Sequence, residues 1–256
     1  MPTDEPSSYQ MRNFYEQLGD GFFSPLDTMN YIQHTAVLKY VHDDDNILDM
    51  CCGRGLLLPL LRFMKKSITS YTGVDVSSTN AVFRTRRVTD NKPIQRGYYP
   101  FQVFFAKVNV AEMTTLLPED HYDVIVYTSS IEHMLPDAGK QSLVEARKVA
   151  KLGATLFLSG PITPEGQDGY ETQYDAHVYE WKRSEIEQGL RDTGWSLEAS
   201  YGLLVTKDVL VASLTPTMLS IFEKQAEFVP WIWLMPVWAS LVPEVAKEVA
   251  YIAKAV

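Results

Sequence analysis

Two aspartates and two glycines stand where a chain can bind a nucleotide-like molecule. Asp49 lies in the apolar run 47–50, and Gly53 and Gly55 follow it before the next apolar stretch. Asp75 stands at the end of the following apolar run. Glycine permits close approach of the backbone, and the amides at a helix start attract an anionic group. An acid at the end of a second strand accepts hydrogen bonds from ribose hydroxyls, so the pattern predicts a nucleoside site.

Two histidines lie in segments that follow predicted strands. His133 comes directly after Glu132 in the segment 128–134, and His177 lies in the polar and aromatic segment 160–180. Histidine is the side chain most often used for proton transfer near neutral pH. Both histidines are therefore candidate acid/base residues. A purely structural hydrogen-bonding role for the two is the equal alternative.

The elements that must carry these residues alternate between strand and helix. Central parallel strands read as short apolar runs, and helices show apolar residues every three or four positions. This alternation indicates an α/β fold whose binding site lies at the carboxyl ends of its strands. We predict strands at 47–50, 71–76, 101–110, 122–127, 151–159 and 195–205, and helices at 56–66, 77–88, 139–150, 181–193 and 215–227.

Finer expectations concern the N-terminal segment and one helix cap. Residues 9–42 carry apolar residues at helical spacing and favour two helices that are broken at 19–25. These helices either cover the binding cleft or complete the core. Helix 181–193 is expected to be capped at Ser184, with Glu187 three residues later as its capping-box partner.

The segment 47–55 carries a family motif. Its sequence, Ile-Leu-Asp-Met-Cys-Cys-Gly-Arg-Gly, resembles the first motif of class I S-adenosylmethionine-dependent methyltransferases, hydrophobic-Leu-Asp-x-Gly-Cys-Gly-x-Gly. Cys51 stands where that motif has its first glycine. Cysteine is small, so we expect the turn to survive, although a positive φ there would cost energy. The other motifs follow in the family's order, and the resemblance covers residues 35–205.

This resemblance implies S-adenosyl-L-methionine as cofactor and S-adenosyl-L-homocysteine as product. Asp75 is then the ribose ligand. Asn109 stands where the family has an aspartate that contacts the adenine amino group, and its carbonyl oxygen can accept the same hydrogen bond. Val110 would lie near the adenine ring, and Thr128 would line the cleft beside the methionine portion. The implied cofactor-binding set is Asp49, Cys51, Gly53, Gly55, Asp75, Val76, Asn109, Val110 and Thr128.

The resemblance also implies the architecture. The expected fold is α/β, with a Rossmann-like seven-stranded, mostly parallel sheet, helices on both faces and an antiparallel last strand. We expect that strand at 249–253, although 245–254 could also be read as a helix. The chain is then a single methyltransferase domain, with an N-terminal helical cover at 1–42, a cofactor-binding core at 43–205, and a C-terminal helical insertion plus last strand at 206–256.

Composition narrows the partners and the compartment. A formal charge of −9 removes the usual electrostatic footprint for nucleic acid. The two cysteines are adjacent, so they cannot join distant segments, and they favour a reducing, cytoplasmic environment. The start of the chain does not read as a signal peptide, and no apolar run reaches the ~20 residues of a membrane span. The apolar stretch 228–238 is expected to lie in the core or to join two copies as a homodimer, and the second alternative is a wall of the substrate pocket.

A metal site is an alternative for the two histidines. Some members of the family, among them small-RNA 2′-O-methyltransferases and ubiquinone-pathway O-methyltransferases, bind a divalent metal through an acidic pair and two histidines. Glu132, His133 and His177 match this pattern, but Ser129 stands where those members have their first glutamate. Loss of an anionic ligand weakens a magnesium site. We therefore assign no metal ligands, and a divalent metal is not favoured.

The sequence thus predicts methyl transfer from S-adenosylmethionine to a small-molecule acceptor, at oxygen or nitrogen. Such a transfer needs the acceptor in line with the methyl carbon, and a base only where a proton must leave. The acidic charge favours a small acceptor. So does the absence, after the fourth predicted strand, of the Asn/Asp-Pro-Pro-Tyr-like motif that nucleic-acid enzymes that methylate amino groups carry there. One alternative is methylation of RNA, DNA or protein, supported by the basic residues of 84–96. The other is a catalytically silent subunit that binds S-adenosylmethionine.

Overall fold

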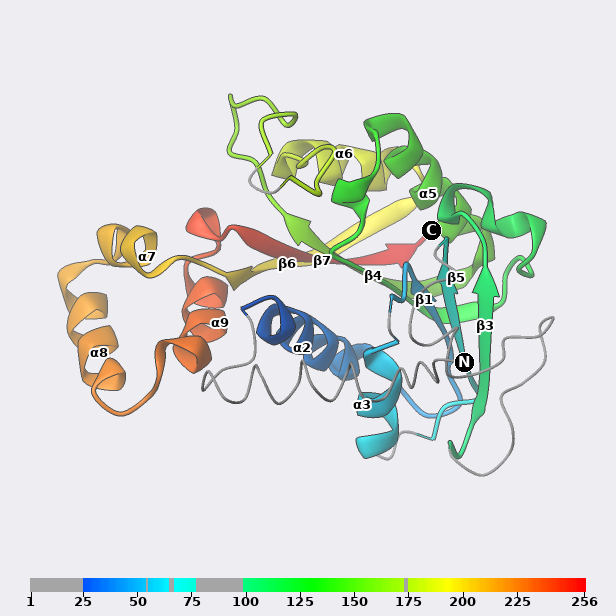
Figure 1. Cartoon of the computed structure of the whole chain (residues 1–256), viewed down its shortest axis with the longest axis horizontal. Coiled ribbons are helices and arrows are strands. Elements are labelled where there is room, and N and C mark those ends of the chain that lie inside the picture. The colour runs from blue at the N-terminus through cyan, green and yellow to red at the C-terminus, as the bar shows by residue number, and fades with distance from the viewer. Residues whose placement is uncertain (1–24, 54, 65–66, 77–98, 173–174) are drawn as a thin grey trace, which may run out of the picture.

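The computed structural model describes residues 25–53, 55–64, 67–76, 99–172 and 175–256. Seven strands within these residues form a single sheet (Figure 1). Apolar runs of β-branched and aromatic residues form its central strands, as a sheet covered on both faces requires. The strands are β1 (Asn46–Met50), β2 (Ser70–Asp75), β3 (Gln102–Lys107), β4 (Tyr122–Thr128), β5 (Ala150–Pro161), β6 (Trp195–Leu204) and β7 (Glu248–Ala255).

The strand order is β3-β2-β1-β4-β5-β7-β6. Strands β1 to β5 pair in parallel, whereas β7 runs antiparallel to both of its neighbours, β5 and β6. The predicted antiparallel last strand is therefore confirmed, and it spans the whole of 248–255. The order in which the chain adds strands reverses between β1 and β4, since β2 and β3 lie on one side and β4 and β5 on the other. Ligands of α/β sheets bind at such a switch point.

Helices cover both faces of the sheet, as predicted. The helical segments are α2 (Pro25–Val37), η1 (Leu38–Tyr40), α3 (Leu57–Phe63), η2 (Val110–Thr115), η3 (Ile131–His133), α5 (Pro136–Val149), α6 (Arg183–Asp192), α7 (Lys207–Ser213), α8 (Pro216–Ala226), α9 (Trp231–Leu241) and η4 (Pro243–Val245). In Figure 1, α2 and α3 lie below the sheet and α5 and α6 lie above it. Their apolar residues build two separate clusters, one on each face.

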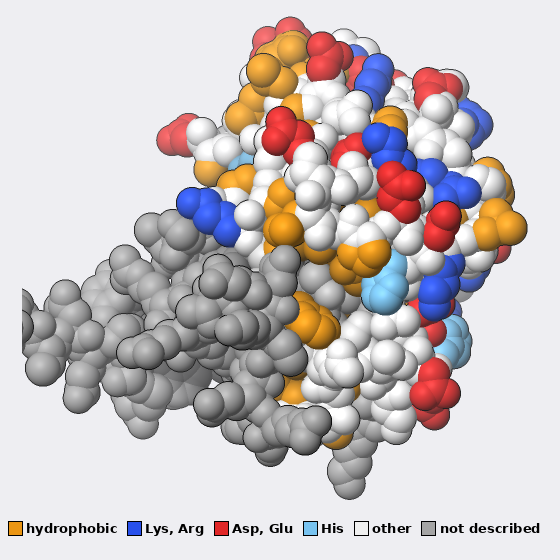
Figure 2. Space-filling view, turned by 90° about the vertical axis from the view of Figure 1, so that its right-hand side faces the viewer, with side chains coloured by type: hydrophobic (Ala, Val, Ile, Leu, Met, Phe, Trp, Pro, Cys, Tyr) orange, Lys and Arg blue, Asp and Glu red, His pale blue; other side chains and the backbone are white. Residues whose placement is uncertain are grey.

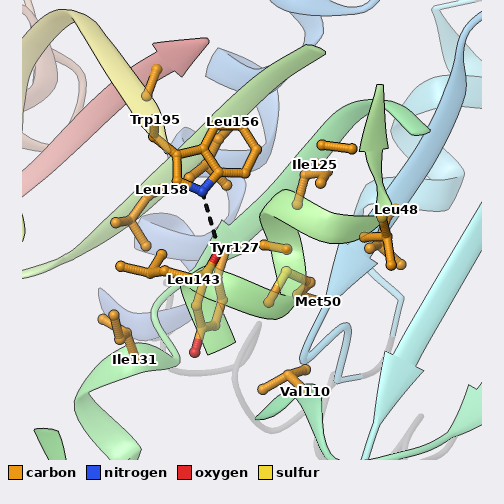
Figure 3. Packing of buried hydrophobic residues seen from close by; sticks show 14 of the residues in the cluster. Leu48, Met50, Val110, Ile125, Tyr127, Ile131, Leu143, Leu156, Leu158 and Trp195 are labelled. Carbon is orange, nitrogen blue, oxygen red and sulfur yellow. Dashed lines mark hydrogen bonds between the residues drawn. The ribbon is translucent and has the colours of Figure 1, made fainter. Parts of the chain in front are cut away.

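Alternation along the strands divides residues between these two clusters. Ile47 packs with the α2 and α3 side, and Leu48 packs with the α5 and α6 side, because successive side chains of a strand point to opposite faces. Figure 3 shows the cluster on the α5 and α6 side. There the indole Nε1 of Trp195 donates a hydrogen bond of 3.2 Å to the backbone oxygen of Leu143. This bond ties the start of β6 to α5.

The helices α7, α8 and α9 extend past the end of the sheet, at the left of Figure 1, and have an apolar cluster of their own. In the sequence these helices come between β6 and β7, which are neighbours in the sheet. They confirm the predicted C-terminal helical insertion. Helix α9 packs closely on β6. A side chain at Gly202 would therefore collide with the backbone of Ala239. Within the described residues, no helix is long and apolar enough to cross a membrane.

Several predicted boundaries are wrong. Helix α6 begins at Arg183, and Glu185 rather than Glu187 accepts the capping hydrogen bond, from the backbone amide of Lys182 at 3.0 Å. Strand β3 ends at Lys107 instead of 110, because the chain turns there into η2. Helix α5 starts at Pro136, since proline is well placed at the first helical position. The predicted helix 77–88 and the first of the two N-terminal helices lie outside the described residues.

Candidate functional site

The turn after β1 has an unusual backbone. Cys51, Gly53 and Gly55 have φ values of 54°, 51° and 68°, in the left-handed region. Glycine adopts this conformation freely, whereas a residue with a Cβ pays ~1–2 kcal/mol for it. The predicted cost of a positive φ at Cys51 is therefore present. The backbone amide of Cys52 donates to the oxygen of Val74 at 2.9 Å, which holds the turn against β2.

Asp75, at the end of β2, lies directly beside this turn. Its Oδ2 accepts a hydrogen bond of 3.0 Å from the backbone amide of Gly53. The side chain is largely buried. The carboxylate at the end of β2 and a glycine amide of the loop after β1 thus meet where the carboxyl ends of these two parallel strands adjoin.

Asp49 is more deeply buried than Asp75. The hydroxyl of Tyr71 donates to Oδ2 of Asp49 at 2.6 Å. Burial raises the pKa of Asp49 from 3.8 to about 7, the hydrogen bond from Tyr71 opposes the rise, and the charge of Asp75 adds to it. Asp49 therefore changes its protonation state near neutral pH. Its hydrogen bond to Tyr71 joins the end of β1 to β2, directly before the turn.

The remaining predicted cofactor residues lie at the ends of β2, β3 and β4. Val76 is exposed, and Val110 is buried in the core. Oδ1 of Asn109 accepts from the amide of Ala111 at 3.0 Å, so it caps η2. Thr128 ends β4, and its backbone oxygen accepts from the hydroxyl of Ser130 at 2.8 Å. Because β1 to β4 are parallel, all of these residues lie at one edge of the sheet.

A buried polar network follows β4. Ser129 has φ 43°, and its amide donates to the oxygen of Ser159 at 2.9 Å. Nε2 of Gln33, from α2, lies 2.8 Å from both the hydroxyl of Ser129 and Oε1 of Glu248. Oε1 of Gln33 accepts from Ser159 at 3.1 Å. Sequence reasoning missed Gln33 and Glu248, because neither belongs to a motif and only the fold brings α2 and β7 to the end of β4.

The two predicted histidines lie together. Their ring centroids are 5.1 Å apart, with an edge-to-face angle of 80°. Two backbone hydrogen bonds join their segments, since the oxygen of Glu132 accepts from Val178 at 2.8 Å and from Tyr179 at 3.1 Å. The loop that carries His177 is thereby fastened to η3, which carries His133.

Each histidine is oriented by a hydrogen bond at Nδ1. Nδ1 of His133 lies 2.8 Å from the backbone oxygen of Ala176, and Nδ1 of His177 lies 2.6 Å from Oε1 of Glu180. A backbone oxygen can only accept, so Nδ1 of His133 donates. In a neutral ring the lone pair is then on Nε2.

Glu132, which directly precedes His133, has an unsatisfied side-chain oxygen. Its side chain is buried, and Oε2 has no hydrogen-bond partner among the described residues. Burial is the main reason that the pKa of Glu132 rises to about 8, and Glu180 raises it further. Burial also raises the pKa of Glu248 well above its ordinary value, to which Glu132 contributes. Three buried glutamates thus share this part of the site.

The same residues could hold a metal ion. One ligand atom from each of Glu132, His133 and His177 lies within 4.8 Å of the other two. Ser129, at the position of the missing glutamate, is engaged by Gln33 and Glu248. The group offers one carboxylate and two imidazoles, a ligand set that differs from the oxygen-rich set of a magnesium site.

A seven-stranded sheet of this order, a glycine turn after β1 and an acid at the end of β2 define a class I S-adenosylmethionine-dependent methyltransferase. A family model described as a methyltransferase domain matches residues 29–200. The chain therefore belongs to the methyltransferase-domain family, and its cofactor is S-adenosylmethionine. None of the curated protein sequences compared with it is significantly similar.

Solved structures share the fold at low sequence identity. One is 1,6-didemethyltoxoflavin-N1-methyltransferase from Burkholderia thailandensis, with 15% identity over 100% of this chain and 92% of that chain, and a TM-score of 0.57. Another is geranyl diphosphate C-methyltransferase from Streptomyces coelicolor A3(2), with 17% identity over 88% and 77% of the two chains and a TM-score of 0.58. A SAM-dependent methyltransferase from Archaeoglobus fulgidus has 14% identity over 88% and 94%, with a TM-score of 0.56.

Proposed function

We propose that this chain transfers the methyl group of S-adenosylmethionine to an oxygen or nitrogen atom of a small-molecule acceptor. The observation that carries the proposal is the contact between Asp75 and Gly53, at the point where a nucleoside must lie in this family. Two methyltransferases whose structures share this fold act, by their names, on the small molecules 1,6-didemethyltoxoflavin and geranyl diphosphate. These names support a small acceptor without identifying it.

The proposed cofactor contacts follow the strand ends. Asp75 accepts hydrogen bonds from the ribose hydroxyls, and the exposed Val76 lies beside it. The turn 51–55 holds the amino-acid end with its backbone amides, and Asp49 supports that turn from within. Asn109 and Val110 hold the adenine, and Thr128 lies beside the methionine portion. Oδ1 of Asn109 already accepts from Ala111, but a carbonyl oxygen has a second lone pair for the adenine amino group.

His133 and His177 serve the acceptor side in this proposal. The bound cofactor supplies a methyl group on a sulfonium sulfur, which leaves as a thioether. The chain has to hold the acceptor atom in line with that methyl group and to take up the proton that the acceptor loses. With Nδ1 of His133 bonded to Ala176, Nε2 is the atom that accepts this proton. His177, oriented by Glu180, lies at the side of the same ring.

The described part of one face supports a small acceptor over a polynucleotide. Figure 2 shows a face on which acidic and basic side chains of the described residues are interspersed. A nucleic-acid site gathers Lys and Arg side chains into a continuous basic patch. The formal charge of −9 agrees with this reading. Salt-dependent binding of RNA or DNA to the purified chain would instead support the polynucleotide alternative.

A silent cofactor-binding subunit is the second candidate. Two observations favour it: Cys51 stands in a left-handed conformation, and Asn109 uses its carbonyl oxygen to cap η2. Calorimetry with S-adenosylhomocysteine tests both candidates, because absence of binding removes each of them. A subsequent screen of hydroxyl and amine metabolites for methyl transfer separates them. Turnover supports the enzyme, and binding without turnover on any acceptor supports the silent subunit.

We also propose that the stretch 228–238 takes part in a homodimer. It forms most of α9, which carries no charged residue. Trp233, Val237 and Leu241 are 64%, 52% and 61% exposed and recur every four residues, so they share one face of α9. An exposed apolar stripe of this kind is typical of a helix that packs against a second helix.

A further inference from the structure

A cavity in the C-terminal helical insertion supports an inference that goes beyond the proposed function. We propose that it binds a free amino acid with an aromatic or large apolar side chain. The cavity has a volume of about 310 Å³ and lies where α7, α8 and α9 meet. Aromatic and apolar side chains line it together with one cation and one anion, and the residues used below are Lys207, Phe222, Glu227, Phe228, Trp231 and Leu234. None of its lining residues belongs to the proposed cofactor contacts or to the polar network after β4.

The walls of the cavity are held by contacts within the insertion. The ring of Phe222, from α8, packs edge-to-face against two tryptophans of α9, with its centroid 6.0 Å from that of Trp231 and 5.6 Å from that of Trp238. Nε1 of Trp238 donates a hydrogen bond of 2.9 Å to Oε1 of Gln225. These contacts join α8 to α9 across the link 227–230. The cavity is therefore present before a ligand arrives, which lowers the cost of binding.

The apolar part of the cavity selects the body of the ligand. Phe222 and Leu234 are buried, whereas Phe228 is 83% exposed. A ligand that covers Phe228 removes apolar surface from water, and an aromatic ring in the ligand adds edge-to-face contacts. Small-molecule sites have volumes of roughly 300–1,000 Å³, so this cavity lies at the low end of the range. It suits a molecule of the size of one amino acid rather than a lipid or a nucleotide.

Two groups of opposite charge select the polar end of the ligand. Lys207 begins α7, and Glu227 directly follows α8. Within the described residues neither side chain has an ion-pair partner, and the two do not pair with each other. A ligand with a single negative charge would gain from Lys207 and lose from Glu227, and a ligand with a single positive charge would do the reverse. A zwitterion complements both groups.

A free amino acid combines these two selections. Its α-carboxylate accepts hydrogen bonds from the ammonium of Lys207, which carries three donors. Its α-ammonium donates to the carboxylate of Glu227. Both protein groups are exposed, so each contributes modestly, and burial of the apolar side chain supplies most of the affinity. The site should therefore prefer large apolar amino acids to small ones.

Four probes separate the features of the ligand. L-Phenylalanine carries both charges and an aromatic body, phenylacetate lacks the ammonium, phenethylamine lacks the carboxylate, and L-alanine lacks the ring. In titration calorimetry of the full chain, we expect L-phenylalanine to saturate at one molecule per chain. It should bind at least about 5-fold more tightly than each of the other three. Equal or tighter binding of any of these three, or no saturable binding of L-phenylalanine, would overturn the proposal.

Two pairs of variants test the charged groups. Lys207→Gln and Glu227→Gln should each weaken the binding of L-phenylalanine by about 5-fold, because each removes one charge that faces the ligand. Lys224→Gln and Glu223→Gln are the matched controls, since both residues lie on α8 and neither lines the cavity. All four side chains are exposed, so the changes leave the core intact. The controls should bind as the wild type does, and unchanged binding in Lys207→Gln or in Glu227→Gln would contradict recognition of a zwitterion.

The cofactor site is tested separately. The titration is repeated with S-adenosylhomocysteine in excess, because the cofactor also has an amino-acid end. The affinity for L-phenylalanine should not change, and its loss would place the amino acid in the cofactor cleft and overturn the proposal. If S-adenosylhomocysteine itself does not bind, the proposed function fails and the amino-acid site stands. The proposed dimer is also distinct, since Trp233, Val237 and Leu241 do not line the cavity.

Discussion

The backbone amide of Gly53 donates a hydrogen bond of 3.0 Å to Oδ2 of Asp75, and this bond joins the turn after β1 to the end of β2. The two residues come from different motifs of the sequence. Their contact places a carboxylate next to a backbone that a cofactor can approach closely.

Replacement of Asp75 by alanine should weaken the binding of S-adenosylhomocysteine by ~1–3 kcal/mol, because hydrogen bonds to a charged group are lost. Calorimetry measures the change. Asp123→Ala is a matched control, since Oδ2 of Asp123 accepts a backbone bond of 2.9 Å from Asn46 at the other end of β1. That variant should keep its affinity. Equal affinities in the wild type and Asp75→Ala would refute the role of Asp75.

The adjacent cysteines should respond differently to glycine. In Cys51→Gly, relief of the positive φ offsets the greater flexibility of the unfolded chain, so the free energy of unfolding should stay within ~1 kcal/mol of the wild type. Cys52 is buried and has no positive φ, so Cys52→Gly should destabilise by ~2 kcal/mol. Urea unfolding of both variants provides the measurement. A larger loss for Cys51→Gly than for Cys52→Gly would contradict the strain at Cys51.

Asp49 should make stability depend on pH. Burial raises its pKa from 3.8 to about 7, so the folded state holds its proton more tightly than the unfolded state does. Its contribution is fully present below pH 3.8 and is lost as the pH rises through about 7. Relative to Asp49→Asn, the wild type should lose up to ~4 kcal/mol of unfolding free energy across this range. Urea unfolding at a series of pH values tests it.

Asp123→Asn is the control of opposite sign. Burial disfavours its ionisation, but Lys151 and the amide of Asn46 outweigh this effect and hold the pKa of Asp123 below 3.8. Its contribution to stability is therefore present above pH 3.8 and is lost as the pH falls. Parallel pH profiles for Asp49→Asn and the wild type would show that Asp49 does not have the raised pKa.

Gln33 should be important for holding α2 on the sheet. Gln33→Leu leaves Ser129, Ser159 and Glu248 without their shared partner, and each buried polar group left unsatisfied costs ~1–3 kcal/mol. We expect a loss of at least ~2 kcal/mol in urea unfolding. Thr35→Ala, on the same helix, removes only bonds to Tyr31 and Ile32 within α2. Its effect should be under ~0.5 kcal/mol, and similar losses in both variants would argue against the network.

The exposed stripe of α9 should control self-association. Trp233→Glu places a charge in the apolar face and should convert a dimer to a monomer, as measured by light scattering after size exclusion. Leu152→Glu changes an apolar side chain that is 79% exposed on a different element, and it should leave the mass unchanged. A wild type that is monomeric at high concentration would refute the homodimer.

Much of the sheet could be predicted from local patterns. The runs 47–50, 122–127 and 151–159 appear as β1, β4 and β5, because strands buried on both faces need uninterrupted apolar residues. The ends of elements were predicted less well. The cap of α6 is formed by Glu185, since the sequence around 181–187 offers several polar residues and only the packing of the helix selects one.

The sequence by itself determined the family and the positions of the cofactor motifs, because a glycine turn after one strand and an acid at the end of the next are local requirements of nucleoside binding. Tertiary structure alone decided which distant residues meet at the end of β4. Gln33 and Glu248 are 215 positions apart and meet at 2.8 Å, although neither belongs to a motif. Such contacts arise because parallel strands bring their carboxyl ends to one edge, and that edge gathers residues with no relation in sequence spacing.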